Sequence, residues 1–261
     1  MLVKVEKLKT ISIYFVILLT IQFTVSCGQK NFYNYETITS KININDSLAS
    51  NTKIEKFIAP YKTHITKTLD SILAYSPVNF DKTKGLWESN IGLLLAKITY
   101  QLGNPVFIKQ QQKQIDFVLL NHGGIRAPIP KGNVTTRTAF NVMPFENNLM
   151  VVALSGLEIR SLATYILNEK KPHPMYGIEL TISKNLDQVK SIRINNSALE
   201  DSKIYHVATS DYLANGGDNM SFFKESNTKF NLNYKLRDVF IDYFKKVDTL
   251  EVISTQIIIE E

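Results

Sequence analysis

The sequence predicts an α+β fold: one domain with a mixed β-sheet and packed helices. Segments in which apolar residues have helical spacing are mixed with short apolar runs, and no regular strand–helix–strand repeat occurs. The composition is typical of a globular domain, because 44% of the 261 residues are hydrophobic and 21% are charged. These values exclude a disordered or low-complexity chain.

The first 26 residues have the layout of a bacterial secretory signal. Three lysines among residues 1–9 precede an uncharged stretch over residues 10–25, which is shorter than the roughly 20 residues of a transmembrane helix. The stretch ends in Thr24-Val25-Ser26-Cys27, which resembles the lipoprotein box, although Thr24 replaces the usual large aliphatic residue. We therefore expect cleavage before Cys27 and lipidation of Cys27, which would attach the protein to a membrane of the cell envelope, on its periplasmic or surface side. An incidental cysteine and an uncleaved anchor are the alternatives.

Residues 27–53 are predicted to form a polar tether, with a short strand over residues 37–44. The segment is rich in Asn, Ser, Thr and Lys and has no hydrophobic period. The domain itself is expected over residues 54–261. With a leader at its start, the chain is expected to be complete as written.

The first half of the domain is predicted to contain two helices and a strand. Apolar residues from Phe57 to Leu73 follow helical spacing. A second helix is expected to begin with a cap at Ser89 and to stop at Gly103 and Pro105. The apolar run over residues 116–120 is bounded by turn signals and predicts a buried strand.

The second half is predicted to supply most of the sheet. A strand over residues 149–154 leads into a helix over residues 155–167, whose start has the capping-box pattern of Ser155 and Glu158. Further elements are expected from their apolar patterns: a hairpin of strands 178–182 and 189–194, a strand over 204–209, a helix over 236–244 and a final strand over 252–259.

Several classes of function lack their sequence signatures. None of the four histidines forms a metal-ligand pair, and the chain has no phosphate-binding loop, nucleophile elbow or dinucleotide fingerprint. The single cysteine cannot supply a structural zinc site. The formal charge of +6 is not gathered into runs, so nucleic acid is not an expected partner. We therefore expect no catalytic residue, metal site or cofactor within this chain.

Two glycine-bearing loops, over residues 119–128 and 207–218, follow predicted strands and are candidates for a binding site. Paired glycines at a strand end let backbone N–H groups approach a ligand closely. Arg126 offers donors suited to phosphate or carboxylate, and Asp218 offers acceptors suited to sugar hydroxyls. Phe145 and Tyr212 offer flat rings on which a base could stack. Each feature has an ordinary alternative: a turn, a surface ion pair or core packing.

Three segments together resemble the C-terminal domain of the 5'-nucleotidase family. Residues 121–156 begin with Asn-His-Gly-Gly-Ile-Arg and continue to Pro-Phe-Glu-Asn, as in the family pattern with its three glycines. Residues 207–223 contain the family's Leu-Ala-x-Gly-Gly-Asp, and residues 88–92 resemble its Glu-Ser-Asn helix start. The segments follow the family's order and spacing, and the resemblance covers residues 54–261.

The resemblance implies that this domain binds a nucleotide, while a separate metallophosphoesterase domain holds two metal ions and cleaves the phosphate. It implies that Asn121 and Arg126 face ribose and phosphate, and that Asp218 holds ribose hydroxyls. The rings of Phe145 and Tyr212 would enclose the base. The loops would be shaped by four glycines: Gly123, Gly124, Gly216 and Gly217.

The chain departs from the family pattern at several positions. His122 replaces the first of the three glycines and adds a side chain near the expected phosphate. Lys97 stands where the family commonly has Asp, and only Lys84, beside Gly85, lies near the place of a further phosphate-facing arginine. The larger departure is the missing metallophosphatase half, because only the tether precedes residue 54.

Two functions agree with these observations. In the first, the chain is the nucleotide-binding subunit of a 5'-nucleotidase-type phosphohydrolase in nucleotide catabolism, and a separate metallophosphatase chain supplies the divalent metal ions. In the second, the lipoprotein binds nucleotides or nucleosides without turnover. A purely structural role would not require the ligand-suited residues. We favour the first function.

Overall fold

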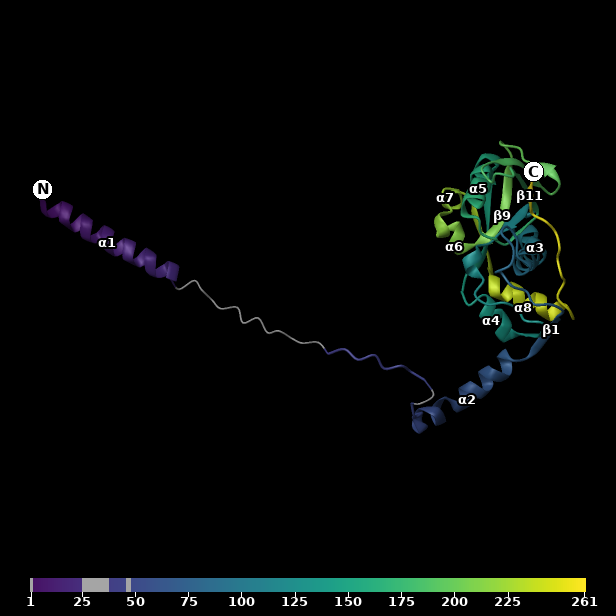
Figure 1. The fold of residues 1–261 in the computed structure, drawn as a ribbon, viewed down its shortest axis with the longest axis horizontal. Coiled ribbons are helices and arrows are strands. Elements are labelled where there is room, and N and C mark those ends of the chain that lie inside the picture. Colours follow the sequence, from purple (N-terminus) through teal and green to yellow (C-terminus); the bar gives the residue numbers. More distant parts are fainter. Residues whose placement is uncertain (1, 25–37, 46–47) are drawn as a thin grey trace. The chain divides into compact units, whose positions relative to one another are not determined.

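In the computed structural model, residues 2–24, 38–45 and 48–261 are described. They fall into two units, Met1–Asn51 and Thr52–Glu261. The described part of the first unit contains one helix, α1 (Leu2–Thr24), while residues 38–45 form neither helix nor strand (Figure 1). The strand expected over residues 37–44 is therefore wrong for residues 38–44, which pair with no strand in the part of the chain that the structure describes. Residue 37, Cys27 and the cleavage site lie outside the described residues.

The second unit contains three sheets. In the smallest, β1 (Ile72–Ser76) pairs antiparallel with β3 (Gly132–Thr135). The central sheet is mixed, because β2 pairs parallel with β9 and every other pairing is antiparallel. Its order is β10 (Lys229–Lys235), β4 (Asn148–Ser155), β9 (Ile204–Ser210), β2 (Phe117–Leu119) and β5 (Met175–Tyr176). The third sheet consists of β11 (Ile258–Glu260), β6 (Ile178–Ile182), β7 (Val189–Ile194) and β8 (Ser197–Ala198).

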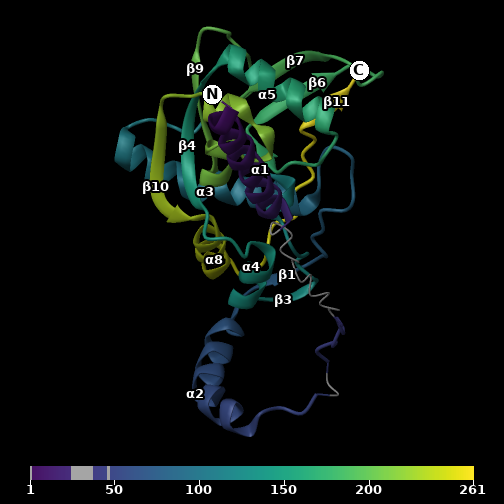
Figure 2. The same ribbon diagram turned by 90° about the vertical axis from the view of Figure 1, so that its left-hand side faces the viewer.

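The inner strands of the central sheet, β4, β9 and β2, lie between helices on the two faces of the sheet (Figures 1 and 2). Along its strands, Val151 and Ala208 belong to a core that they share with α3 (Asn90–Gln111) and α8 (Leu236–Lys246). Their chain neighbours Val152 and Val207 belong to a second core, which they share with α5 (Gly156–Glu169) and α7 (Ser221–Lys224). Successive side chains of a strand point to opposite faces, so a sheet covered on both sides needs continuous apolar runs. This is why the runs in β2, β4 and β9 predicted buried strands correctly.

Two helices begin where the sequence places them. In α5 the Ser155 hydroxyl accepts a hydrogen bond from the Glu158 amide at 3.3 Å, and the Glu158 carboxylate accepts one from the Ser155 amide at 2.6 Å. In α3 the Ser89 hydroxyl accepts from the Gly92 amide at 3.2 Å. These caps satisfy N–H groups that have no partner inside the helix.

The predicted stop of α3 at Gly103 and Pro105 is wrong, because the helix continues to Gln111. Its later turns are held by tertiary packing: Phe107 is completely buried, and a Cβ on Gly103 would lie 2.8 Å from Leu149. Tertiary packing can stabilise a helix enough to continue through residues that otherwise disfavour helix. Among the described residues, α3 alone has the length and hydropathy of a membrane span, and many of its residues lie in the core.

Two other predicted boundaries are also wrong. The first helix predicted for the domain corresponds to α2 (Thr52–Leu69) and ends before Leu73. Residues 72–76 form β1 instead. The final strand is confined to residues 258–260, and just before it the Ile257 amide donates to the Glu88 carboxylate at 2.7 Å. The remaining short helices, α4 (Thr136–Val142) and α6 (Asp211–Ala214), are too short to show a hydrophobic period in the sequence.

Candidate functional site

The first glycine loop follows β2 and contains a tight turn that begins at Asn121. Residues 122–124 form a single 3₁₀ turn, in which the Gly124 amide donates to the Asn121 carbonyl at 3.0 Å. A Cβ on Gly124 would lie 2.8 Å from the Asn121 side-chain oxygen. Glycine at this position therefore lets the loop pack directly against the Asn121 amide, which fixes where that amide points.

Three contacts from other elements hold this loop in place. The Lys82 ammonium donates to the Ile125 carbonyl at 2.6 Å, and the Arg126 amide donates to the Val142 carbonyl at 2.9 Å. The His122 amide donates to Nδ1 of His173 at 3.3 Å. Because its backbone groups are paired from three directions, the loop presents Arg126 from a fixed position.

The second glycine loop is closed by a tyrosine–aspartate pair. The Tyr212 hydroxyl donates to the Asp218 carboxylate at 2.8 Å and accepts from the Asp218 amide at 3.2 Å. The hydrogen bond to the carboxylate raises the pKa of Tyr212. From α5, the Tyr165 hydroxyl donates to the Asp218 carbonyl at 2.8 Å. A Cβ on Gly217 would lie 2.5 Å from the Tyr212 ring, so this ring can lie over the loop only because residue 217 is glycine.

A third segment, Phe145–Asn147, is fastened from α8. The Arg237 guanidinium donates to the Phe145 carbonyl at 3.3 Å and forms an ion pair with Glu146. Lys235 pairs with the same carboxylate at 2.8 Å, and the hydrogen bonds from Lys235 and Arg237 lower the pKa of Glu146 to about 2. Arg237 is itself buried, with only 6% of its surface exposed. These contacts hold the peptide between Phe145 and Glu146, which is the backbone that carries the Phe145 ring.

The three segments enclose one cavity of about 330 Å³. Within it the Arg126 guanidinium lies over the Phe145 ring, 5.2 Å from the ring centre. Arg126 is the one cationic lining residue and Asp218 is the one carboxylate. The cavity therefore suits a ligand with an anionic group, a flat ring and hydroxyl donors. The lining residues are Asn121, Gly123, Gly124, Arg126, Phe145, Asn147, Tyr212 and Asp218.

Seven of the nine residues that the sequence nominates for the site line this cavity. The other two, Gly216 and Gly217, lie in the second loop behind Tyr212; Gly216 has a φ of +90°, a conformation that favours glycine. The residue that sequence reasoning missed in the lining is Asn147, although it stands in the Pro-Phe-Glu-Asn segment. Nothing in the sequence pattern distinguished Lys82 and Arg237 as supports, because their contacts join segments far apart in the chain.

The departures from the family pattern also have places in the structure. Nδ1 of His122 lies 3.3 Å from the Pro172 carbonyl, and burial lowers the pKa of this imidazole. Lys97 pairs with Glu251 at 2.7 Å. A Cβ on Gly85 would lie 2.0 Å from the Glu88 carbonyl, and Gly85 has a φ of +93°, so the turn before Glu88 requires glycine there.

The described residues contain no group of three or more His, Cys, Asp or Glu side chains that could hold a metal ion.

Comparison with known proteins places the fold and the loops in a family. The family model described as "5'-nucleotidase, C-terminal domain" matches residues 66–225. The trifunctional nucleotide phosphoesterase protein YfkN of Bacillus subtilis is 25% identical over 237 residues, which cover 80% of this chain and 15% of that protein. The cell wall protein Lmo0130 of Listeria monocytogenes is 26% identical over 172 residues, covering 60% of this chain and 21% of that protein.

The fold is similar to that of a solved structure as well. The 5'-nucleotidase precursor from Thermus thermophilus superposes with a TM-score of 0.67 at 22% identity, covering 79% of this chain and 42% of that chain. This chain thus spans less than half the length of each of these three proteins.

Proposed function

The chain belongs to the family of 5'-nucleotidase C-terminal domains, and from this premise we propose that it is the nucleotide-binding subunit of a 5'-nucleotidase-type phosphohydrolase. The observation that carries the proposal is the cavity between the three segments. It combines Arg126, Phe145, Tyr212 and Asp218 in one space of about 330 Å³. A cation, flat rings and a carboxylate within one cavity correspond to the phosphate, base and ribose of a nucleotide.

Each contact of the proposed complex follows from the chemistry of its residue. The Arg126 guanidinium binds the phosphate through charge-assisted hydrogen bonds, assisted by the Asn121 amide. The base stacks on the rings of Phe145 and Tyr212, each stacking contact contributing about 1–3 kcal/mol. The Asp218 carboxylate accepts hydrogen bonds from the ribose hydroxyls and already has one oxygen oriented by the Tyr212 hydroxyl.

We assign the hydrolytic step to a second chain. In the proposed assembly a separate metallophosphatase holds divalent metal ions, which activate a water molecule for attack on the phosphate. The present chain contributes substrate binding and orientation: it holds the base and ribose so that the phosphate faces the partner. Its own residues neither coordinate the metals nor transfer a proton in this proposal.

The proposed location is the bacterial cell envelope, with Cys27 lipidated and the domain held at a membrane surface. The support is the order of basic residues, apolar stretch and cysteine at the start of the chain. The similarity to a protein named as a cell wall protein agrees with an envelope location.

The proposal is tested by purifying the tagged full-length chain from its own membranes in mild detergent and measuring phosphate release from AMP. We expect hydrolysis that a chelator abolishes and that added divalent metal restores. Purification of Arg126→Ala under the same conditions should bring down the same partner with a raised KM for AMP. If the purified chain binds AMP but no preparation releases phosphate, the subunit proposal is wrong and the chain is a non-enzymatic nucleotide-binding lipoprotein.

A further inference from the structure

The helix ahead of the sheets, α2 (Thr52–Leu69), carries an apolar face that the rest of its unit does not bury. Phe57, Ile58, Tyr61 and Ile65 recur at the three- and four-residue intervals that align side chains on one side of a helix. Their exposed fractions are 72%, 36%, 63% and 53%, and no residue of the helix is buried. Helices of globular domains ordinarily bury such a stripe, so α2 is built to contact something beyond its own domain.

The polar side of the same helix is basic. It carries four lysines, at positions 53, 56, 62 and 67, against the single acidic residue Glu55. The apolar face is rich in aromatic residues, and the rings of Phe57 and Tyr61 contact each other with their centres 6.1 Å apart. An apolar face with aromatic rings, bordered by lysines, matches the surface of a bilayer with anionic headgroups, which attract nearby lysines.

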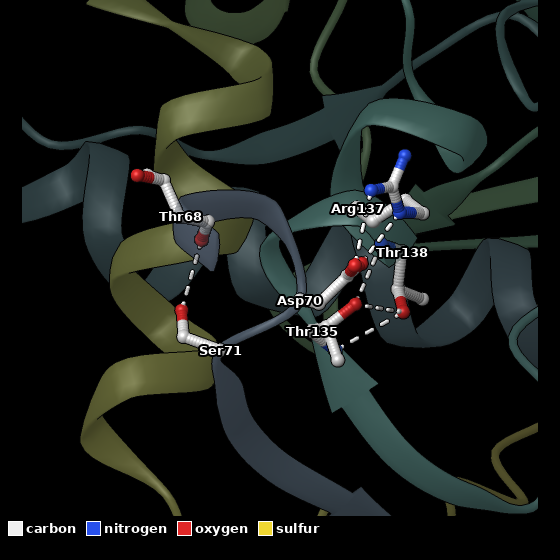
Figure 3. A network of polar contacts seen from close by, with 6 residues as sticks. All are labelled: Thr68, Asp70, Ser71, Thr135, Arg137 and Thr138. Atoms are coloured by element: carbon white, nitrogen blue, oxygen red, sulfur yellow. Dashed lines mark hydrogen bonds and ion pairs between the residues drawn. The ribbon is translucent and has the colours of Figure 1, made fainter. Parts of the chain in front are cut away.

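The C-terminal end of α2 is fixed to the domain by a bidentate ion pair, shown in Figure 3. Nε and Nη2 of Arg137, in α4, donate to the two carboxylate oxygens of Asp70 at 2.5 and 3.1 Å. Arg137 lies in the first turn of α4, which is itself closed by a capping box between Thr135 and Thr138. The C-terminal end of α2 is thus joined to α4. In the sequence, its N-terminal end follows the segment that contains Cys27.

We propose that α2 is an in-plane membrane helix, which lays Phe57, Ile58, Tyr61 and Ile65 into an anionic bilayer surface with its lysines at the headgroups. The proposal uses the Cys27 anchor only for proximity to the membrane; the affinity comes from the helix itself. The function of α2 is then to orient the domain on the membrane, because Asp70 and Arg137 join the helix to α4. A protein surface that covers the same face is the competing outcome of the test.

The test places a fluorescent reporter on each side of α2 in the full-length chain. Phe57→Trp puts tryptophan on the apolar face, and Thr63→Trp is the matched control on the polar side. The native Trp87 is 5% exposed and provides a constant background that is subtracted with the unmodified chain. Each variant is reconstituted into vesicles of phosphatidylglycerol and phosphatidylethanolamine whose acyl chains carry bromine, which quenches tryptophan on contact.

We expect bromolipid to quench tryptophan at position 57 several-fold more strongly than at position 63, with an emission shift to shorter wavelength. The quenching should fall when phosphatidylcholine replaces phosphatidylglycerol, and in a variant with Lys56→Gln, Lys62→Gln and Lys67→Gln. Chain that associates with vesicles while both positions stay unquenched would overturn the helix proposal and leave the anchor standing. No association with any vesicle would overturn both. Blue-shifted emission at position 57 without lipid would assign the face to protein contact and overturn the proposal as well.

Discussion

Arg126 is the residue on which the distinction between nucleotide and nucleoside depends. It is the one cationic residue in the cavity lining, and its loop is held by Lys82 and His173. A phosphate contact by a guanidinium contributes to AMP binding and not to adenosine binding. The residue therefore offers a comparison in which one ligand is the control for the other.

We expect Arg126→Ala to weaken AMP binding about 10- to 100-fold, which corresponds to the roughly 1.5–3 kcal/mol of a hydrogen bond to a charged group. Adenosine binding should change by less than about threefold, less than a single such bond would cost. Arg126→Lys should fall between, because it keeps the charge and loses the bidentate fork. Calorimetric titration with both ligands measures the two effects, and an equal loss for both would contradict the phosphate role.

His173 shows how the first loop responds to pH. Its side chain is 4% exposed and its Nε2 has no partner, while Nδ1 accepts the hydrogen bond of the His122 amide. Burial lowers the pKa of His173 from 6.5 to about 4, so the folded protein holds this imidazole neutral. Burial also lowers the pKa of His122.

The sign of the pH effect follows from these shifts. Between pH 6.5 and 4 the unfolded chain takes up a proton at residue 173 that the folded chain does not. The free energy of unfolding should therefore fall as the pH drops through this window, by up to about 3 kcal/mol from His173. Urea titrations at pH 7.5 and pH 4.5 measure the loss. It should be smaller in His173→Asn, which cannot titrate; an identical loss in the variant would contradict the assignment.

At the scale of the element, the second loop depends on a ring packed directly onto glycine. We expect Gly217→Ala to weaken AMP binding by at least about tenfold, because the new methyl group would displace the Tyr212 ring and break its bond to Asp218. Tyr212→Phe is the comparison variant, because it removes the hydrogen bond to Asp218 while residue 217 stays glycine. An AMP affinity in Gly217→Ala equal to that of the unmodified chain would contradict the requirement for glycine beneath the Tyr212 ring.

The elements also show what the sequence can predict. The capping residues predict the starts of α3 and α5 correctly, because a cap is a hydrogen bond between residues that are close together in the sequence. The ends were less predictable, since α3 passes through Gly103 and Pro105 on the strength of tertiary packing. The predicted final strand begins too early, because its pattern does not show that the Ile257 amide donates to Glu88, a residue distant in the chain.

At the scale of the whole molecule, the resemblance implied that side chains from residues 121–156 and 207–223 would meet, and both segments contribute to the lining of one cavity. The third segment of the resemblance, residues 88–92, is not part of that lining. Local physics alone could not have shown that the two segments meet, because a pair of glycines or a lone arginine has an ordinary structural role in most proteins. Neither the family resemblance nor the local sequence pattern predicts that Lys82 and Arg237 support the site. Their contacts with Ile125 and Phe145 exist only once the chain has folded.

The central claim is that this chain binds a nucleotide by itself. Calorimetric titration of AMP into the full-length chain in detergent, without divalent metal, tests it most directly. The account predicts saturable binding at one site, weakened at least about tenfold in Asp218→Ala, which removes the ribose contacts. No binding of AMP, adenosine, UMP or a UDP-sugar by the unmodified chain, or an unchanged affinity in Asp218→Ala, would contradict it.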